Sequence, residues 1–157
     1  RWSETRFTGL AFGHGRFVAL GDFDGALVSN DGVTWERRAY EAGPYGASLR
    51  GTTLVFNGSV FFAPGGFLQS GLGLVSGDGL TWSEVAKVAP FKDFMVDSPP
   101  TGDVGLLGAD WRPPAFVAGE RIYLNGRLTV DGGTESVTLT SRDGINDWEQ
   151  VRMTGAP

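Results

Sequence analysis

The chain of 157 residues has no cysteine and a single histidine, His14. The absence of cysteine excludes disulfide bridges, thiolate metal sites and a cysteine nucleophile, although it leaves the cellular compartment open. One histidine also argues against a Ser-His-Asp triad and against a histidine-rich metal site. Because His14 lies between two glycines, we expect it to be an exposed turn residue.

Basic residues and long apolar runs are also scarce. The 13 Lys and Arg residues are outnumbered by 18 Asp and Glu residues, which gives a net charge of -5. An acidic surface repels phosphate backbones, so the composition argues against nucleic-acid binding. No apolar run approaches the roughly 18 residues of a membrane-spanning helix, so no membrane span is predicted.

Turn-forming residues, by contrast, are abundant. The chain contains 25 Gly and 8 Pro, and 12% of its residues are aromatic. Short apolar segments separated by glycine-rich turns are typical of all-β proteins such as sandwiches, barrels and propellers.

Three copies of one pattern, S-x-D-G-x-T-W, divide the chain. The residues that carry the pattern are Ser29, Asp31, Gly32 and Trp35, then Ser76, Asp78, Gly79 and Trp82, then Ser141, Asp143, Gly144 and Trp148. In the third copy, Asn146 and Asp147 replace the threonine and add one residue, so we expect a looser turn there. A hairpin motif of strand, glycine turn and strand precedes each copy, at residues 10–21, 54–65 and 115–126.

Each repeat predicts four short strands. Their expected ranges are 7–12, 16–20, 26–29 and 34–40, then 49–56, 59–63, 72–76 and 81–85, then 114–118, 121–125, 136–141 and 147–153. Four-stranded sheets that recur about every 40–50 residues are typical of a β-propeller. We therefore predict an all-β fold. We expect residues 1–157 to form one partial propeller, with antiparallel blades at 7–40, 48–86 and 114–153.

The number of blades predicts that the ring is incomplete. Closed propellers have about four to eight blades, so three cannot close. Residues 1–6 read as an additional outer strand whose Trp2 ends a missing box. The sequence therefore predicts part of a larger ring. Either the chain is a piece of a longer propeller, or a second chain or a second copy completes it.

The three boxes resemble the Asp boxes of sialidase-like, or BNR-repeat, propellers, over nearly all of the chain except residues 89–113. In such a box the Asp accepts backbone N–H bonds, the Gly supplies positive φ and the Trp packs between neighbouring sheets. The box residues are therefore predicted to be structural. A sialidase also needs an arginine triad, a tyrosine nucleophile and an acidic partner. Because Trp111-Arg112-Pro113 is only faintly similar to the arginine motif, no catalytic role is assigned.

Strand alternation predicts which side of the propeller binds a ligand. The first and third turns of each blade, boxes included, emerge on one side, and the longer connections 22–25, 64–71, 126–135 and the insertion 89–113 emerge on the other. Long connections on a rigid scaffold commonly carry binding residues. Binding and simple capping of a blade are both open interpretations of the insertion. The candidate ligand-binding residues on this side are Asp22, Asp24, Phe67, Asp110, Trp111, Arg112, Arg127 and Asp131.

These features favour a non-catalytic binding module that recognises a glycan or a protein, in an extracytoplasmic or secreted bacterial protein. One alternative is part of a sialidase-like glycoside hydrolase whose other active-site residues lie in absent blades. Another is the structural half of a split propeller. No cofactor is predicted. Calcium at Asp22-Phe23-Asp24-Gly25 is a weaker interpretation than a plain turn, because the rest of a calcium loop is missing.

Overall fold

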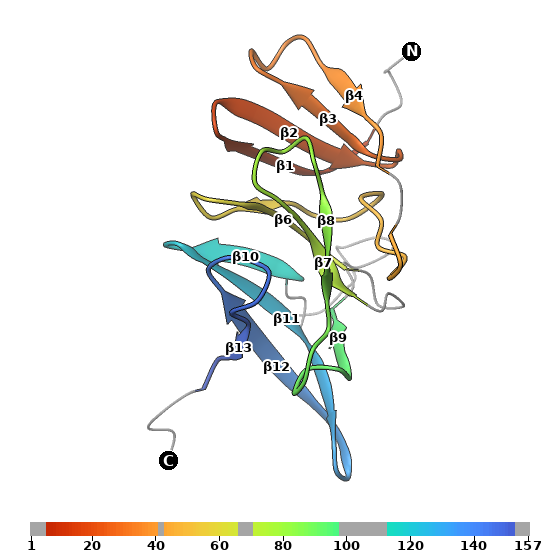
Figure 1. Ribbon diagram of the computed structural model, residues 1–157, viewed down its shortest axis with the longest axis vertical. Coiled ribbons are helices and arrows are strands. Elements are labelled where there is room, and N and C mark those ends of the chain that lie inside the picture. Colours follow the sequence, from red (N-terminus) through yellow and green to blue (C-terminus); the bar gives the residue numbers. More distant parts are fainter. Residues whose placement is uncertain (1–5, 41–42, 66–70, 98–112, 153–157) are drawn as a thin grey trace, which may run out of the picture.

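The computed structural model describes residues 6–40, 43–65, 71–97 and 113–152, which fold into three successive antiparallel sheets. The sheets are stacked along the long axis of the molecule, with the N-terminal sheet at the top and the C-terminal sheet at the bottom (Figure 1). All regular structure in these residues is strand. No helix able to cross a lipid bilayer occurs in the part of the chain that the structure describes.

Each sheet contains one blade of four strands in sequence order, and the third sheet has a fifth strand, β9 (Phe94–Val96). Blade 1 consists of β1 (Phe7–Gly13), β2 (Arg16–Gly21), β3 (Ala26–Ser29) and β4 (Glu36–Arg38). Blade 2 consists of β5 (Val55–Phe56), β6 (Phe61–Pro64), β7 (Gly71–Ser76) and β8 (Ser83–Ala86). Blade 3 consists of β10 (Ala115–Ala118), β11 (Arg121–Val130), β12 (Gly133–Ser141) and β13 (Glu149–Gln150). The predicted all-β fold of four-stranded antiparallel blades, a partial β-propeller, is thus confirmed.

The first strand of blade 2 is much shorter than predicted. The sequence predicts a strand over 49–56, but β5 contains only Val55 and Phe56. The preceding segment is held differently, because the backbone N–H groups of Tyr45 and Ala47 donate to the Glu84 carboxylate at 2.9 and 2.8 Å. A carboxylate takes the place of a neighbouring strand as the hydrogen-bond acceptor, so these N–H groups are satisfied although the segment does not join the sheet.

Two segments predicted to be irregular contain strand. The connection 126–135 is a continuation of β11 and β12, which pair as far as Val130 opposite Gly133. The β-branched residues Thr129, Val130 and Thr134 favour this extension, and Gly132, with φ of 96°, closes the turn. In the insertion, β9 (Phe94–Val96) pairs with β11 from Phe94 opposite Leu128 to Val96 opposite Gly126. The 98–112 part of the insertion lies outside the described residues, as do residues 1–5 of the predicted outer strand.

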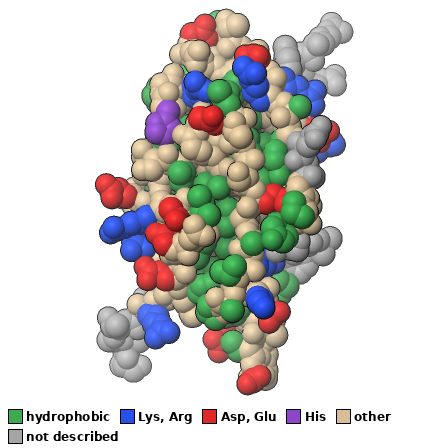
Figure 2. Space-filling view, viewed as in Figure 1, with side chains coloured by type: hydrophobic (Ala, Val, Ile, Leu, Met, Phe, Trp, Pro, Cys, Tyr) green, Lys and Arg blue, Asp and Glu red, His purple; other side chains and the backbone are tan. Residues whose placement is uncertain are grey.

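The core lies between blades, and strand alternation decides which blade each side chain contacts. Phe61 belongs to the core that blades 1 and 2 share, whereas its neighbour Phe62 belongs to the core shared by blades 2 and 3. In Figure 2, hydrophobic side chains gather over the middle of the molecule, where blade 2 lies between its neighbours. We call the side of a blade that meets the preceding blade its upstream face, and the side that meets the following blade its downstream face.

Candidate functional site

The first two boxes are closed hydrogen-bonded turns between the third and fourth strands of their blades. Asp31 Oδ1 accepts the backbone N–H groups of Val33 and Thr34 at 2.8 and 2.7 Å. The bonds from Thr34 and then Val33 hold the pKa of the Asp31 carboxyl at about 2, below its ordinary 3.8. Asp78 repeats the arrangement with Leu80 and Thr81, both at 2.8 Å, and the Thr81 N–H is the largest cause of its lowered pKa. These carboxylates are directed at their own turns.

The third box has more hydrogen bonds than the other two, so the expectation of a looser turn is wrong. Asp143 Oδ1 accepts the N–H groups of Ile145 and Asn146 at 2.6 and 2.9 Å. The additional Asp147 carboxylate accepts the Ser141 hydroxyl and also the Arg142 N–H, the latter at 3.1 Å to Oδ1 and 3.0 Å to Oδ2. The inserted residue therefore brings a second acceptor that ties the turn together.

The boxes of blades 2 and 3 also form the contact with the preceding blade. Trp82 and Trp148 are only 9% and 8% exposed and lie in the inter-blade cores. A Cβ on Gly79 would lie 2.6 Å from Val18 Cγ2 of blade 1, and Gly79 has φ of 76°. Glycine is therefore required twice over at this position, for the turn and for the close approach of two blades.

Trp35 differs from this pattern. The sequence predicts that it packs between neighbouring sheets, yet it is only half-buried, and its described ring contacts are to Phe7 and Phe17 of its own blade, with ring centroids 6.0 and 6.4 Å apart. The reason is its position: among the described residues, no sheet lies upstream of blade 1.

The upstream face of blade 1 is consequently an exposed apolar surface, made by Phe7, Leu10, Phe12, Phe17 and Trp35. Phe7, Leu10 and Phe12 are 51%, 58% and 56% exposed. The equivalent repeat positions of Leu10 in blades 2 and 3 are Leu54 and Ala115, which are 6% and 5% exposed. One repeat position is therefore buried where a described blade precedes it and exposed in blade 1, where no described blade does.

Polar contacts recur at both blade junctions. At the first junction, His14 Nε2 donates to the Ser59 carbonyl at 2.8 Å and an Arg16 N–H donates to the Asp78 carbonyl at 3.2 Å. At the second junction, Asn57 Nδ2 donates to the carbonyls of Glu120 and Arg142 at 2.9 and 2.7 Å. At each junction, the turn region between the first two strands holds one carbonyl from the next blade's equivalent turn and one from its box. We call this arrangement the turn clamp.

The turn clamp was missed by sequence reasoning. The sequence predicts that His14 is an exposed turn residue, and it is exposed, but its side chain also joins two blades. The sequence shows no common pattern for the turn clamp, because the donor side chains differ in residue type and in repeat position between the two blades. The acceptors are backbone carbonyls, which no motif marks.

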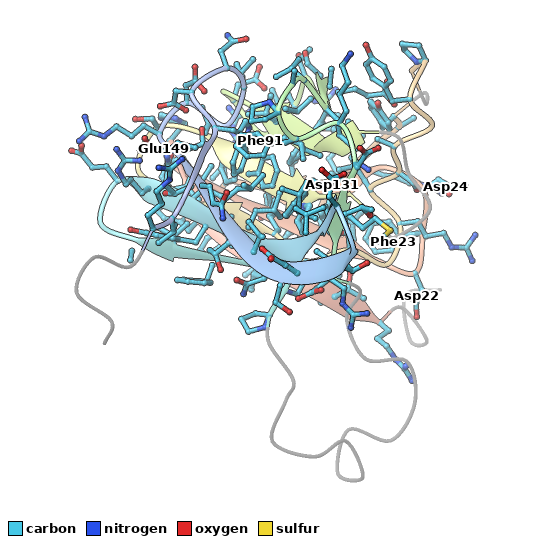
Figure 3. The ribbon with its side chains drawn as sticks, turned by 90° about the horizontal axis from the view of Figure 1, so that it is seen from below. Asp22, Phe23, Asp24, Phe91, Asp131 and Glu149 are labelled. Carbon is cyan, nitrogen blue, oxygen red and sulfur yellow. The ribbon has the colours of Figure 1, made fainter. Side chains whose placement is uncertain are left out.

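The structure does not bring the described ligand candidates together. Asp22 and Asp24 lie in the β2–β3 turn of blade 1, and Asp131 lies in the β11–β12 turn of blade 3. Figure 3 looks along the stack and projects the three near one another, but Figure 1 shows blades 1 and 3 at opposite ends of the molecule. Arg127 lies within β11, with its Nε 4.0 Å from an Asp97 carboxylate oxygen.

The remaining candidates, Phe67, Asp110, Trp111 and Arg112, lie outside the described residues. The binding roles of all eight candidates stay predictions. Within residues 6–40, 43–65, 71–97 and 113–152 there is no group of three or more His, Cys, Asp or Glu side chains placed to hold a metal ion.

A cavity lies on the opposite, box side of the molecule, which sequence reasoning did not select. Its volume is about 290 Å³, and its lining includes Arg16, Asp31, Glu36, Arg38 and Leu80. Cationic and anionic groups are mixed here, because Arg38 pairs with Glu36 at 2.9 Å and Arg16 donates to a backbone carbonyl. The cavity therefore lies at the contact between blade 1 and the second box, and its mixed charges do not favour a ligand of either sign.

No family model matches the chain, and no curated protein matches it. Among solved structures, the chain is similar to YCF48 from Cyanidioschyzon merolae, with 16% sequence identity and a TM-score of 0.49, over 94% of this chain and 37% of that chain. The class of protein is therefore defined by the sheets themselves: three consecutive blades of a partial β-propeller. The more specific Asp-box family stays a prediction.

Proposed function

We propose that this chain is a non-catalytic interaction module whose recognition surface is the upstream face of blade 1, and that this face binds a further propeller blade. The observation that carries the proposal is the contrast at one repeat position. Leu10 is 58% exposed, whereas Leu54 and Ala115 are 6% and 5% exposed because a blade covers them.

Burial of this face supplies the driving force. Covering an exposed side chain of this size contributes about 1.5–3 kcal/mol, and the face presents several of them side by side. Contiguous apolar patches of this kind on soluble proteins mark interaction sites. Blades 2 and 3 use the same repeat positions for packing, so a blade is the element that fits them.

Glycan recognition on the side of the long connections, away from the boxes, has less support. Its described candidates Asp22 and Asp131 belong to blades at opposite ends of the stack, so they do not form one binding site for a small glycan. The same separation argues against a glycosidase, whose two carboxylates must lie close together. The carboxylates of Asp31 and Asp78, in turn, accept hydrogen bonds from their own turns.

The test is the mass in solution, measured by light scattering over a range of protein concentrations. We expect the wild-type chain to associate above 16.7 kDa and the double variant Leu10→Glu/Phe12→Glu to remain a folded monomer, because two buried charges oppose docking. Val88→Glu is the matched control, since Val88 is 53% exposed but lies after β8, away from this face. A monomeric wild type, or association that the double variant does not weaken, would overturn the proposal.

A further inference from the structure

The partner of the upstream face can be named, an inference that rests on the proposed function. We propose that the upstream face of blade 1 binds the downstream face of blade 3 in a second copy of this chain, head to tail. The downstream face of blade 3 is the cross-strand row Phe116, Tyr123 and Thr140.

Equivalent rows form the downstream faces at both internal junctions. In blade 1 the row is Ala11, Val18 and Val28, and in blade 2 it is Val55, Phe62 and Val75. Each of these rows packs in the core that is shared with the following blade. The row of blade 3 is the third of the series, and no described sheet follows it.

Two of the three side chains in this row are aromatic and only partly buried, whereas Thr140 is 6% exposed. Phe116 is 39% exposed, and its ring stacks on that of Tyr123 with centroids 5.0 Å apart and an interplanar angle of 6°. This aromatic pair would meet Phe12, Phe17 and Trp35 on the upstream face of the other copy. Aromatic side chains contribute the most area per residue at protein interfaces.

The turn clamp extends to the same junction. Arg121 begins the second strand of blade 3 just as Arg16 begins that of blade 1. Arg16 donates to the Asp78 carbonyl of the next blade, and the carbonyl equivalent to Asp78 on blade 1 is that of Asp31. Arg121 pairs with Glu149 at 2.9 Å with both side chains partly exposed. An ion pair of this kind is weak, so the guanidinium can be redirected to the Asp31 carbonyl at little cost.

The two faces lie at opposite ends of the stack of three blades (Figure 1). Within the described residues they therefore do not meet, and head-to-tail pairing of two copies brings them together. Two head-to-tail copies use both faces of each and place six blades in one ring, within the range in which propellers close. Pairing of two upstream faces would instead leave both downstream rows and both Arg121 side chains unused.

The absence of cysteine allows a direct test, since an introduced thiol is the only one in the chain. Gly13 and Phe56 meet at the first junction, where a Cβ on Gly13 would lie 2.6 Å from the Phe56 ring. At the proposed junction between two copies, the counterpart of Gly13 is Ala118 of one copy and the counterpart of Phe56 is Phe12 of the other. We expect Phe12→Cys and Ala118→Cys chains, mixed and treated with a short bis-maleimide, to give a cross-linked dimer containing one of each.

Each outcome bears on a different part of the argument. Neither variant alone should cross-link, and neither should a mixture of Val88→Cys with Ala118→Cys. Cross-linking of Phe12→Cys with itself would overturn the head-to-tail pairing, while the binding role of the upstream face would still stand. A monomeric wild type in light scattering would overturn both.

A second variant examines the clamp independently of any cross-link. Arg121→Gln removes the proposed donor to Asp31 from the edge of the interface, and its effect on folding can be followed by the circular dichroism of the monomer. We expect the dissociation constant of the pair to rise roughly tenfold or more, as for loss of a hydrogen bond from a charged donor. Arg37→Gln, which removes a donor to the Asp24 carbonyl in the β2–β3 turn, should leave it unchanged. Equal constants for wild type and Arg121→Gln would contradict the clamp.

Discussion

At the scale of single residues, each box is a self-contained arrangement of polar groups. The Ser29 hydroxyl accepts the Gly32 N–H at 2.9 Å and donates to Asp31 Oδ1 at 3.0 Å, while that oxygen accepts two further N–H groups. All of these partners lie within a few residues of one another. A motif in the sequence therefore predicts their arrangement well, because nothing distant is needed to form it.

The ionised Asp31 carboxylate should make stability depend on acid pH. Its pKa in the folded chain is about 2, against 3.8 ordinarily. A depressed pKa contributes stability that is present above the unfolded value and is lost as the pH falls from about 4 towards 2. We expect the urea midpoint of the wild type to fall over this range more steeply than that of Asp31→Asn. Urea unfolding at several pH values measures this, and parallel curves for the two proteins would contradict it.

At the scale of elements, the polar joint between blades 2 and 3 depends on one buried side chain. Asn57 is 5% exposed, donates to the Glu120 and Arg142 carbonyls and accepts the N–H groups of Ser59 and Val60 at 3.1 and 2.9 Å. Both ends of the amide are thus used, so no other side chain of similar size satisfies all four groups.

Asn57→Ala should therefore destabilise the chain by about 2–4 kcal/mol, because it leaves several buried polar groups unsatisfied. Asn57→Asp should cost at least as much at neutral pH, since it places a carboxylate against two carbonyl oxygens. Chemical unfolding measures the loss, with Asn30→Ala as the control, an exposed box position where a change within about 0.5 kcal/mol is expected. Similar stabilities for Asn57→Ala and Asn30→Ala would show that the joint is not anchored by this amide.

The same element scale explains what the sequence could not predict. Blade architecture follows from the repeated hairpin and box. By contrast, β9 pairs closely with β11 where Gly126 leaves room for the Met95 carbonyl and the Phe94 ring. Likewise, the segment before β5 is held by Glu84, far along the chain, which accepts the N–H groups of Tyr45 and Ala47. Contacts of this kind depend on the folded arrangement of distant segments. The distances between the ligand candidates could not be predicted from the sequence for the same reason. They depend on how the blades are arranged, and this arrangement places Asp22 far from Asp131.

At the scale of the whole molecule, each blade is stabilised mainly by the neighbours on its two faces, as in other stacked-repeat proteins. The position of a blade in the stack should then decide the effect of a mutation. Leu10 and Leu54 occupy the same repeat position, but one is 58% exposed and the other 6%. Identical substitutions at these two sites compare an open blade face with a covered one.

Leu54→Ala should cost about 2–5 kcal/mol, the usual range for a buried leucine, at any protein concentration. Leu10→Ala should change stability by less than about 0.5 kcal/mol in dilute solution, where the upstream face is exposed. The stability difference between wild type and Leu10→Ala should then grow as the protein concentration rises. Association covers the upstream face and stabilises the folded wild type, and it stabilises the variant less. Urea unfolding at two protein concentrations separates these cases. A concentration-independent cost at Leu10 that equals the cost at Leu54 would mean that another part of the same chain already covers the upstream face, which would contradict its role as a binding surface.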